Sequence, residues 1–137
     1  MWFLDTNIFV YTFDATAPAK RKRARTLVKE SLASGDGCVS SQVANEFTNL
    51  ALRKFQVPLT DEECRAYFDN VLAPMCHVGW SPDLFRRALG LHGRSQLSWY
   101  DALIVSAALQ GGCSTLYSED LQDGRRFGDL TVRNPFT

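Results

Sequence analysis

Short hydrophobic runs alternate with longer segments of helical periodicity along the whole chain. The short runs predict strands over residues 3–4, 38–40, 76–78, 115–117 and 130–132. The longer segments predict helices over 8–13, 19–33, 43–52, 61–72, 82–91 and 99–110. Strands that alternate with such helices are typical of a parallel sheet covered on both faces. The pattern therefore predicts one α/β domain over residues 1–137, a three-layer α/β/α arrangement with a mostly parallel central sheet of about four to five short strands.

Several helix ends are marked by residues that satisfy free backbone groups. Thr60 and Glu63 have the spacing of a capping box, and Ser98 precedes the last helix as a cap. Pro74 is expected to end the helix that Thr60 begins, and Gly111 the last helix. The polar segments 93–98 and 118–128 are predicted to be loops.

Four acidic residues occupy positions where a carboxylate is difficult to accommodate. They end a strand, follow a strand, or lie on helices with apolar neighbours, and they are Asp5, Glu46, Asp101 and Asp120. Carboxylates are rarely buried unless they are paired, protonated or bound to a cation. Ligands of parallel sheets bind beyond the carboxyl ends of the strands, where these four acids are expected to converge. Such a cluster predicts a site for Mg²⁺ or Mn²⁺, which prefer oxygen ligands.

Each of these acids also has an ordinary structural interpretation. Asp101 is three residues after Ser98 and can complete a helix cap, while Glu46 can be a surface residue of an amphipathic helix. Asp120 can be a simple loop residue, and Asp123 competes with it for the fourth position in the cluster. Asp5 is the hardest to explain in this way, because it directly follows an apolar strand.

An acid-only metal site suits phosphodiester hydrolysis, in which the ion activates a water molecule and neutralises charge on the leaving oxygen. The sequence offers little competing chemistry. It contains no glycine-rich phosphate loop, and neither the two histidines nor the four cysteines have the spacing of zinc ligands. A phosphatase that forms an aspartyl phosphate would need a second Asp at the position of Asn7.

The charge pattern neither requires nor excludes a nucleic-acid ligand. The chain is neutral overall and 45% apolar, but Lys20 to Arg25 form a dense basic run. This run is either a solvated helix face or a contact surface for RNA phosphates. No signal peptide or membrane-spanning run is apparent, so we expect the cytoplasm as the compartment and no membrane partner.

Four segments that contain these acids resemble, in order and spacing, the motifs of PIN-domain ribonucleases. The segments are Phe3–Ile8, Val43–Phe47, Trp99–Ile104 and Leu116–Leu121. The length of the chain resembles that of the VapC-type toxins of bacterial toxin–antitoxin pairs. The resemblance implies an Mg²⁺- or Mn²⁺-dependent endoribonuclease toxin with a PIN-like fold, and RNA as its substrate.

The resemblance also implies roles for single residues and for partners. Asp5 and Asp101 would be the main metal ligands, and Glu46 and Asp120 would bind through water, a second ion or the attacking water. Supporting roles in orienting ligands or contacting phosphate fall to Asn7 and Ser118, with Asp123 as the alternative fourth acid. A protein antitoxin would occupy the groove, often with an Arg inserted among the carboxylates.

The family implies a homodimer as well. Phe55, Tyr67 and Phe68 are candidates for its interface if they do not belong to the core. Two other functions stay open at this point: a nuclease of the same family that processes RNA without being a toxin, and a non-catalytic module that binds a basic partner. The identity of the RNA cannot be read from the sequence.

Overall fold

The computed structural model describes residues 1–137. The strands are β1 (Trp2–Leu4), β2 (Gly37–Ser40), β3 (Cys76–Val78), β4 (Thr115–Tyr117), β5 (Arg126–Phe127) and β6 (Leu130–Arg133). The helices are α1 (Thr6–Tyr11), α2 (Pro18–Ser34), α3 (Ser41–Arg53), α4 (Asp61–Tyr67), α5 (Pro82–Ser95) and α6 (Trp99–Gln110). Between α4 and β3 lie a π-helical segment, η1 (Phe68–Leu72), and a 3₁₀ turn, η2 (Ala73–Met75).

The strands form one sheet in the order β3-β2-β1-β4-β6-β5. All neighbouring strands are parallel except β5, which pairs antiparallel with β6. The predicted α/β class and mostly parallel sheet are confirmed, although there are six strands rather than four or five. The additional strand, β5, lies inside the segment 118–128 that was predicted to be a loop. It has only two residues and therefore too little alternation to be recognised in the sequence.

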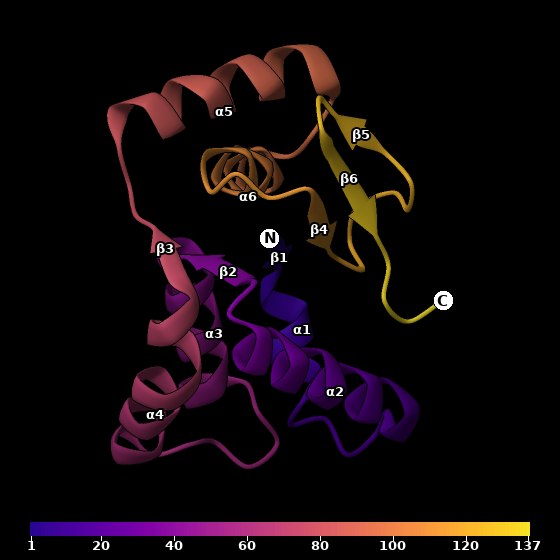
Figure 1. Cartoon of the computed structure of the whole chain (residues 1–137). Coiled ribbons are helices and arrows are strands. Elements are labelled where there is room, and N and C mark those ends of the chain that lie inside the picture. Colours follow the sequence, from indigo (N-terminus) through magenta and orange to yellow (C-terminus); the bar gives the residue numbers. More distant parts are fainter.

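Helices cover both faces of this sheet (Figure 1). On one face α6 packs against β2 and β4, and α5 packs across α6. On the other face α2 and α3 pack against β2, with α1 between them and α4 beyond α3. The core between these layers contains 31 buried hydrophobic residues, including Phe3, Leu4 and Leu116 from the central strands. The middle of each of the two central strands, β1 and β4, is therefore buried between the helical layers.

The largest differences from the predicted helix boundaries lie in α4 and α5, whereas α1 begins and ends two residues earlier than predicted. The helix that Thr60 begins has its capping box, but its regular part ends at Tyr67 and continues as η1 and η2. Pro74 lies within η2 rather than after the helix. Helix α5 continues to Ser95, so that only the end of the segment 93–98 is a loop. The next residue, Gln96, has a positive φ of 55° and ends the helix, because this left-handed conformation cannot continue it.

The predicted interface residues separate into two groups. Phe55 and Tyr67 pack with Phe13 and Phe47 in an aromatic cluster, in which the Phe47 and Tyr67 rings stack at 4.7 Å. Phe68 is 41% exposed. The first two therefore serve intramolecular packing, and only Phe68 presents much apolar surface to a partner.

The four cysteines are free thiols, and three of them are buried. None of the helices combines the length and the hydropathy that a bilayer span requires.

Candidate active site

One pocket of about 550 Å³ opens beyond the carboxyl ends of the parallel strands, and all four predicted acids line it. β1 leads directly into Asp5, and β4 leads through Ser118 to Asp120. Glu46 lies in the second turn of α3, which follows β2, and Asp101 lies in the first turn of α6. The parallel arrangement brings the ends of β1, β2 and β4 to one edge, which explains how residues so far apart in sequence share a pocket.

Asp5 is 5% exposed and is held by hydrogen bonds from two segments. Its Oδ1 accepts from the backbone N–H of Thr6 at 2.7 Å, which caps α1, and its Oδ2 accepts from the Ser118 hydroxyl at 2.8 Å. The pKa of Asp5 is raised to about 7, chiefly by burial; the two hydrogen bonds lower it, and the charges of Asp120 and Glu46 add to the raising effect. This carboxylate therefore lies beside other acids without a neutralising cation.

The two residues after Asp5 each hold a further acid of the pocket. The Thr6 hydroxyl donates to Glu46 Oε1 at 2.8 Å, and Asn7 Nδ2 donates to Asp120 Oδ2 at 3.0 Å. Asn7 Oδ1 is buried and has no hydrogen-bond partner. The segment Asp5–Asn7 thus connects the carboxylates of Asp5, Glu46 and Asp120. Thr6 was not among the predicted site residues, although its position next to Asp5 was a signal.

Asp101 takes part in the helix cap only through its backbone. Its N–H donates to the Ser98 hydroxyl at 3.2 Å, as the cap predicts. Its carboxylate accepts no hydrogen bond and is directed to the pocket that it lines. Gln42 links this helix to α3, because its Nε2 donates to the Tyr100 carbonyl at 3.3 Å and to Glu46 Oε1 at 3.4 Å. The side chain of Asp101 is therefore not occupied by capping.

The structure distinguishes Asp120 from Asp123 as the fourth acid of the pocket. Asp123 Oδ1 accepts from the backbone N–H of Asn134 at 2.8 Å, and Asp123 does not line the pocket. Asp123 therefore holds the loop after β4 against the end of β6. The side chain at the pocket is that of Asp120.

A fifth acid, Glu119, lies at the edge of the pocket and was not predicted as a site residue. It accepts from the Tyr11 hydroxyl at 2.6 Å and forms an ion pair with Lys20 Nζ at 2.6 Å. These two hydrogen bonds lower the pKa of Glu119 against the effect of its burial, which is the largest influence and raises the pKa. Glu119 is thus neutralised by Lys20, the first residue of the basic run, while the four predicted acids have no such cation.

Comparison with known proteins agrees with this arrangement. A family model described as the PIN domain matches residues 2–126. The chain belongs to the PIN domain family. The resemblance predicted from the four motifs is therefore confirmed. No curated protein sequence matches the chain.

Several solved structures have a similar fold. A toxin–antitoxin complex from Klebsiella pneumoniae has 19% identity and a TM-score of 0.71, with 98% of each chain covered. FitAcB from Neisseria gonorrhoeae has 16% identity and a TM-score of 0.67, with 99% of each chain covered. VapC20 from Mycobacterium tuberculosis, a toxin that cleaves the sarcin–ricin loop, has 20% identity and a TM-score of 0.62, with 86% of this chain and 88% of that chain covered. At these identities the likeness establishes the fold.

The acid pocket of this PIN domain has the chemistry of a hard divalent cation site. Its candidate ligands are all oxygen atoms, the buried carboxylate of Asp5 lacks a cation, and Asn7 Oδ1 lacks a partner. As the side chains stand, no group of three or more His, Cys, Asp or Glu is arranged to hold a metal ion. The residue types fit Mg²⁺ or Mn²⁺, which accept oxygen ligands and keep water molecules where the protein supplies few.

Proposed function

We propose that this PIN domain, spanning residues 1–137, is an Mg²⁺- or Mn²⁺-dependent endoribonuclease and the toxin of a type II toxin–antitoxin pair. The observation that carries the proposal is the pocket in which Asp5 is buried beside Glu46 and Asp120 without a cation, and which Asp101 also lines. A cluster of this kind costs free energy unless a cation neutralises it. Strongly shifted carboxylate pKa values of this kind are concentrated at functional sites.

In this proposal Asp5 and Asp101 bind the ion directly. A bound divalent ion stabilises charge on the phosphate and makes water a better nucleophile at neutral pH. Ser118 and the Thr6 backbone fix the orientation of the Asp5 carboxylate. Thr6 orients Glu46, and Asn7 orients Asp120, so that both acids can hold the attacking water or a water-bridged ion.

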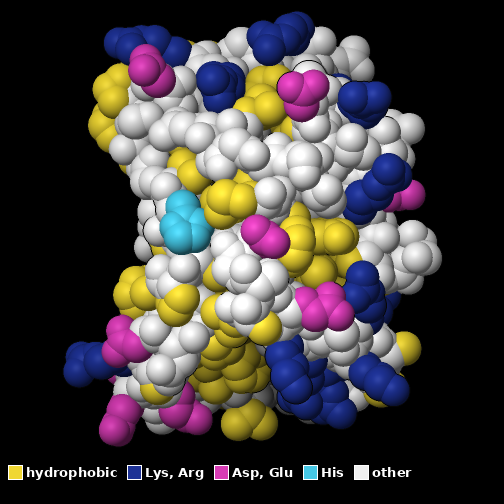
Figure 2. All heavy atoms as spheres, viewed as in Figure 1, with side chains coloured by type: hydrophobic (Ala, Val, Ile, Leu, Met, Phe, Trp, Pro, Cys, Tyr) yellow, Lys and Arg dark blue, Asp and Glu magenta, His cyan; other side chains and the backbone are white.

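The surface of α2 supports RNA as the substrate. Arg21, Lys22, Arg25 and Lys29 line a shallow depression that has no hydrophobic lining residue. Figure 2 shows the Lys and Arg side chains of this region gathered at the lower right, over α2. Lys20, from the same helix, reaches the edge of the acid pocket through Glu119. A basic helix that contacts the edge of an acidic pocket through Lys20 suits a polyanion, because the helix attracts the phosphate backbone and the pocket is where cleavage would occur.

The toxin role is supported by structures with the same fold, which include a toxin–antitoxin complex and the toxin VapC20. A cognate protein antitoxin would occupy the acid pocket, and an Arg inserted among the carboxylates would neutralise them in place of the metal. Homodimerisation and action in the cytoplasm are part of the same proposal. Phe68 is the remaining candidate among the predicted interface residues.

Cleavage of total cellular RNA by the purified protein tests the proposal. We expect defined fragments with Mg²⁺ or Mn²⁺, none with EDTA, and a rate at least about 100-fold lower for Asp101→Asn, which keeps the shape and the Ser98 cap but removes the charge. Undiminished cleavage by Asp101→Asn would refute the assigned site.

The alternatives predict different outcomes. A non-catalytic module would bind a basic partner tightly and cleave no RNA with any metal. An RNA-processing nuclease would cleave RNA, yet its expression would not arrest growth and no neighbouring gene would suppress its effect. Expression with and without the genomic neighbour therefore separates a toxin from a processing enzyme.

A further inference from the structure

A second groove of about 350 Å³ lies directly beside the acid pocket. Its apolar wall is formed by Trp80, Leu84, Tyr100 and Leu103, from the loop after β3 and from α5 and α6. Its polar wall includes the amides of Gln42 and Asn45 on α3. The volume is within the range of roughly 300–1,000 Å³ that is usual for small-molecule sites.

The two most exposed aromatic side chains of the protein line this groove. Trp80 is 71% exposed and Tyr100 is 65% exposed, whereas the next aromatic residue, Phe68, is 41% exposed. Large aromatic side chains are normally well buried, and their exposure in one groove with polar neighbours indicates a binding surface. None of the residues that line the groove is Lys or Arg, so it is not built for a phosphate group.

The groove and the acid pocket share a wall. Gln42, Glu46 and Tyr100 line both, and Tyr100 immediately precedes Asp101 in α6. The hydrogen bond from Gln42 to the Tyr100 carbonyl holds this wall together. A molecule with a phosphate among the carboxylates would therefore place its adjoining group over Tyr100.

We propose that the groove binds the base of a nucleotide adjacent to the scissile phosphate. This proposal rests on the proposed function, and it identifies the surface that the RNA strand follows when it leaves the acid pocket. The base stacks on Trp80 or Tyr100, and the amides of Gln42 and Asn45 face its edge. Stacking on exposed aromatic rings is how single-stranded RNA is commonly held, and amide groups can read base edges.

Short single-stranded RNAs that carry 2-aminopurine at successive positions test the proposal. The Asp101→Asn protein serves as the background, since the proposed function predicts that it binds RNA without cleaving it. We expect one position at which fluorescence is quenched on binding, and loss of that quenching in Trp80→Ala or Tyr100→Ala. The same substitutions should weaken RNA binding by about 5- to 100-fold, whereas Tyr100→Phe, which keeps the ring, should bind normally.

A matched control is Leu89→Ala, which removes a 52% exposed apolar side chain of α5 outside the groove. It should leave RNA binding and quenching unchanged. In otherwise wild-type protein, Trp80→Ala and Tyr100→Ala should raise KM or alter the preferred cleavage position.

Two results would overturn the proposal while leaving the proposed function intact: unchanged binding and cleavage in both alanine variants, or conversion of a dimer to a monomer by them without an effect on a base at the groove. The second result would identify the groove as a protein interface. Absence of metal-dependent cleavage in the wild type would instead refute the proposed function.

Discussion

Asp5 follows β1, caps α1 and accepts a hydrogen bond from Ser118 beyond β4, so three parts of the chain determine its position. A strand end next to a helix start explains why this residue was recognisable in the sequence. Its partner Ser118, which is fully buried, contacts Asp5 only because β1 and β4 are neighbours in the sheet. The identity of an acid can thus be read locally, whereas its surroundings depend on the fold.

Ser118→Ala should lower RNA cleavage or metal affinity by about 10- to 100-fold, because Asp5 loses the hydrogen bond that orients its carboxylate. Initial cleavage rates over a range of Mn²⁺ concentrations measure this. Asp123→Ala is the matched control: it removes the bond to Asn134 in the same loop and should leave the metal dependence unchanged. Equal losses in both variants would mean that only loop stability is being measured.

At the scale of the secondary-structure element, the starts of helices and the ends of strands position the acidic side chains of the pocket. Ser98 caps the start of α6 and thereby determines where Asp101 lies. Ser40 caps the start of α3, and Glu46 lines the pocket from the second turn of that helix. The Ser98 cap was predicted from the sequence, because serine and threonine oxygens satisfy the free N–H groups at a helix start. β5, η1 and the longer α5 were not predicted, because they depend on pairing or packing rather than on a local signal.

Ser98→Ala should cost about 1 kcal/mol of stability, because the first turn of α6 loses its cap. Since Asp101 lies in that turn, cleavage should fall as well. Thr60→Ala removes the comparable cap of α4, away from the pocket, and should cost similar stability with normal cleavage. Urea unfolding and cleavage rates check both variants, and normal activity in Ser98→Ala would show that the cap does not position Asp101.

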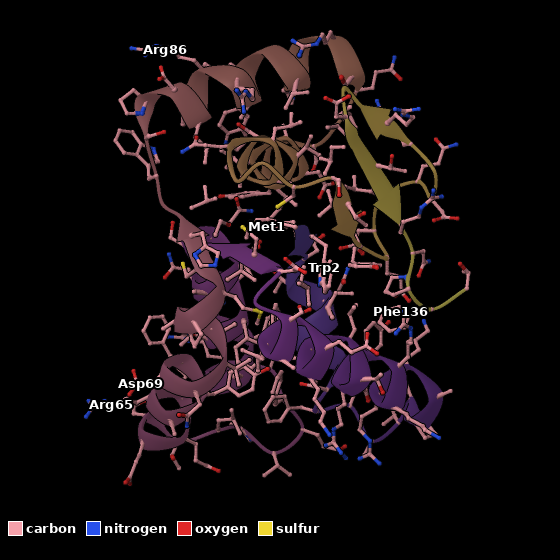
Figure 3. All side chains as sticks on the ribbon, in the orientation of Figure 1. Met1, Trp2, Arg65, Asp69, Arg86 and Phe136 are labelled. Carbon is pink, nitrogen blue, oxygen red and sulfur yellow. The ribbon has the colours of Figure 1, made fainter.

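The basic face of α2 gives a second prediction at this scale. Arg21→Glu with Lys22→Glu should weaken RNA binding uniformly over sequences and flatten its dependence on salt, because fewer phosphates are neutralised. Arg65→Glu is a control for charge reversal outside α2, since Arg65 extends from the end of α4 into solvent (Figure 3). RNA titrations at several salt concentrations provide the measurement. An unchanged salt slope in the double variant would mean that α2 is only a solvated face.

At the scale of the whole molecule, the acid pocket links stability to pH and to metal. The pKa of Asp5 is raised from 3.8 to about 7 in the folded protein, chiefly by burial. Between about pH 4 and pH 7, the Asp5 carboxyl is therefore protonated in the folded state and ionised in the unfolded state. The contribution of Asp5 to stability is complete below pH 4 and is lost as the pH rises to about 7. The loss is at most about 4 kcal/mol.

Metal-free protein should therefore become less stable between about pH 4 and pH 7, and Asp5→Asn should have a shallower pH dependence. Mg²⁺ or Mn²⁺ at about 100 times its Kd should raise the Tm of the wild type by about 5–10 °C at pH 8, and by less at pH 5.5, where protons compete. Thermal melts in EDTA and in each metal test this. A metal response that is equal in Asp5→Asn would contradict direct binding by Asp5.

The sequence by itself determined the α/β class, the PIN family, most helix ends and three of the four candidate acids, Asp5, Glu46 and Asp101, because periodicity, capping and strand ends are local properties. Only the tertiary structure decided that Asp120 rather than Asp123 faces the pocket and that Thr6 and Asn7 hold other acids. It also decided that Lys20 neutralises Glu119 and that Trp80 and Tyr100 line one groove. These relations join residues from different elements, and they follow from strand order and helix packing, which no local pattern specifies.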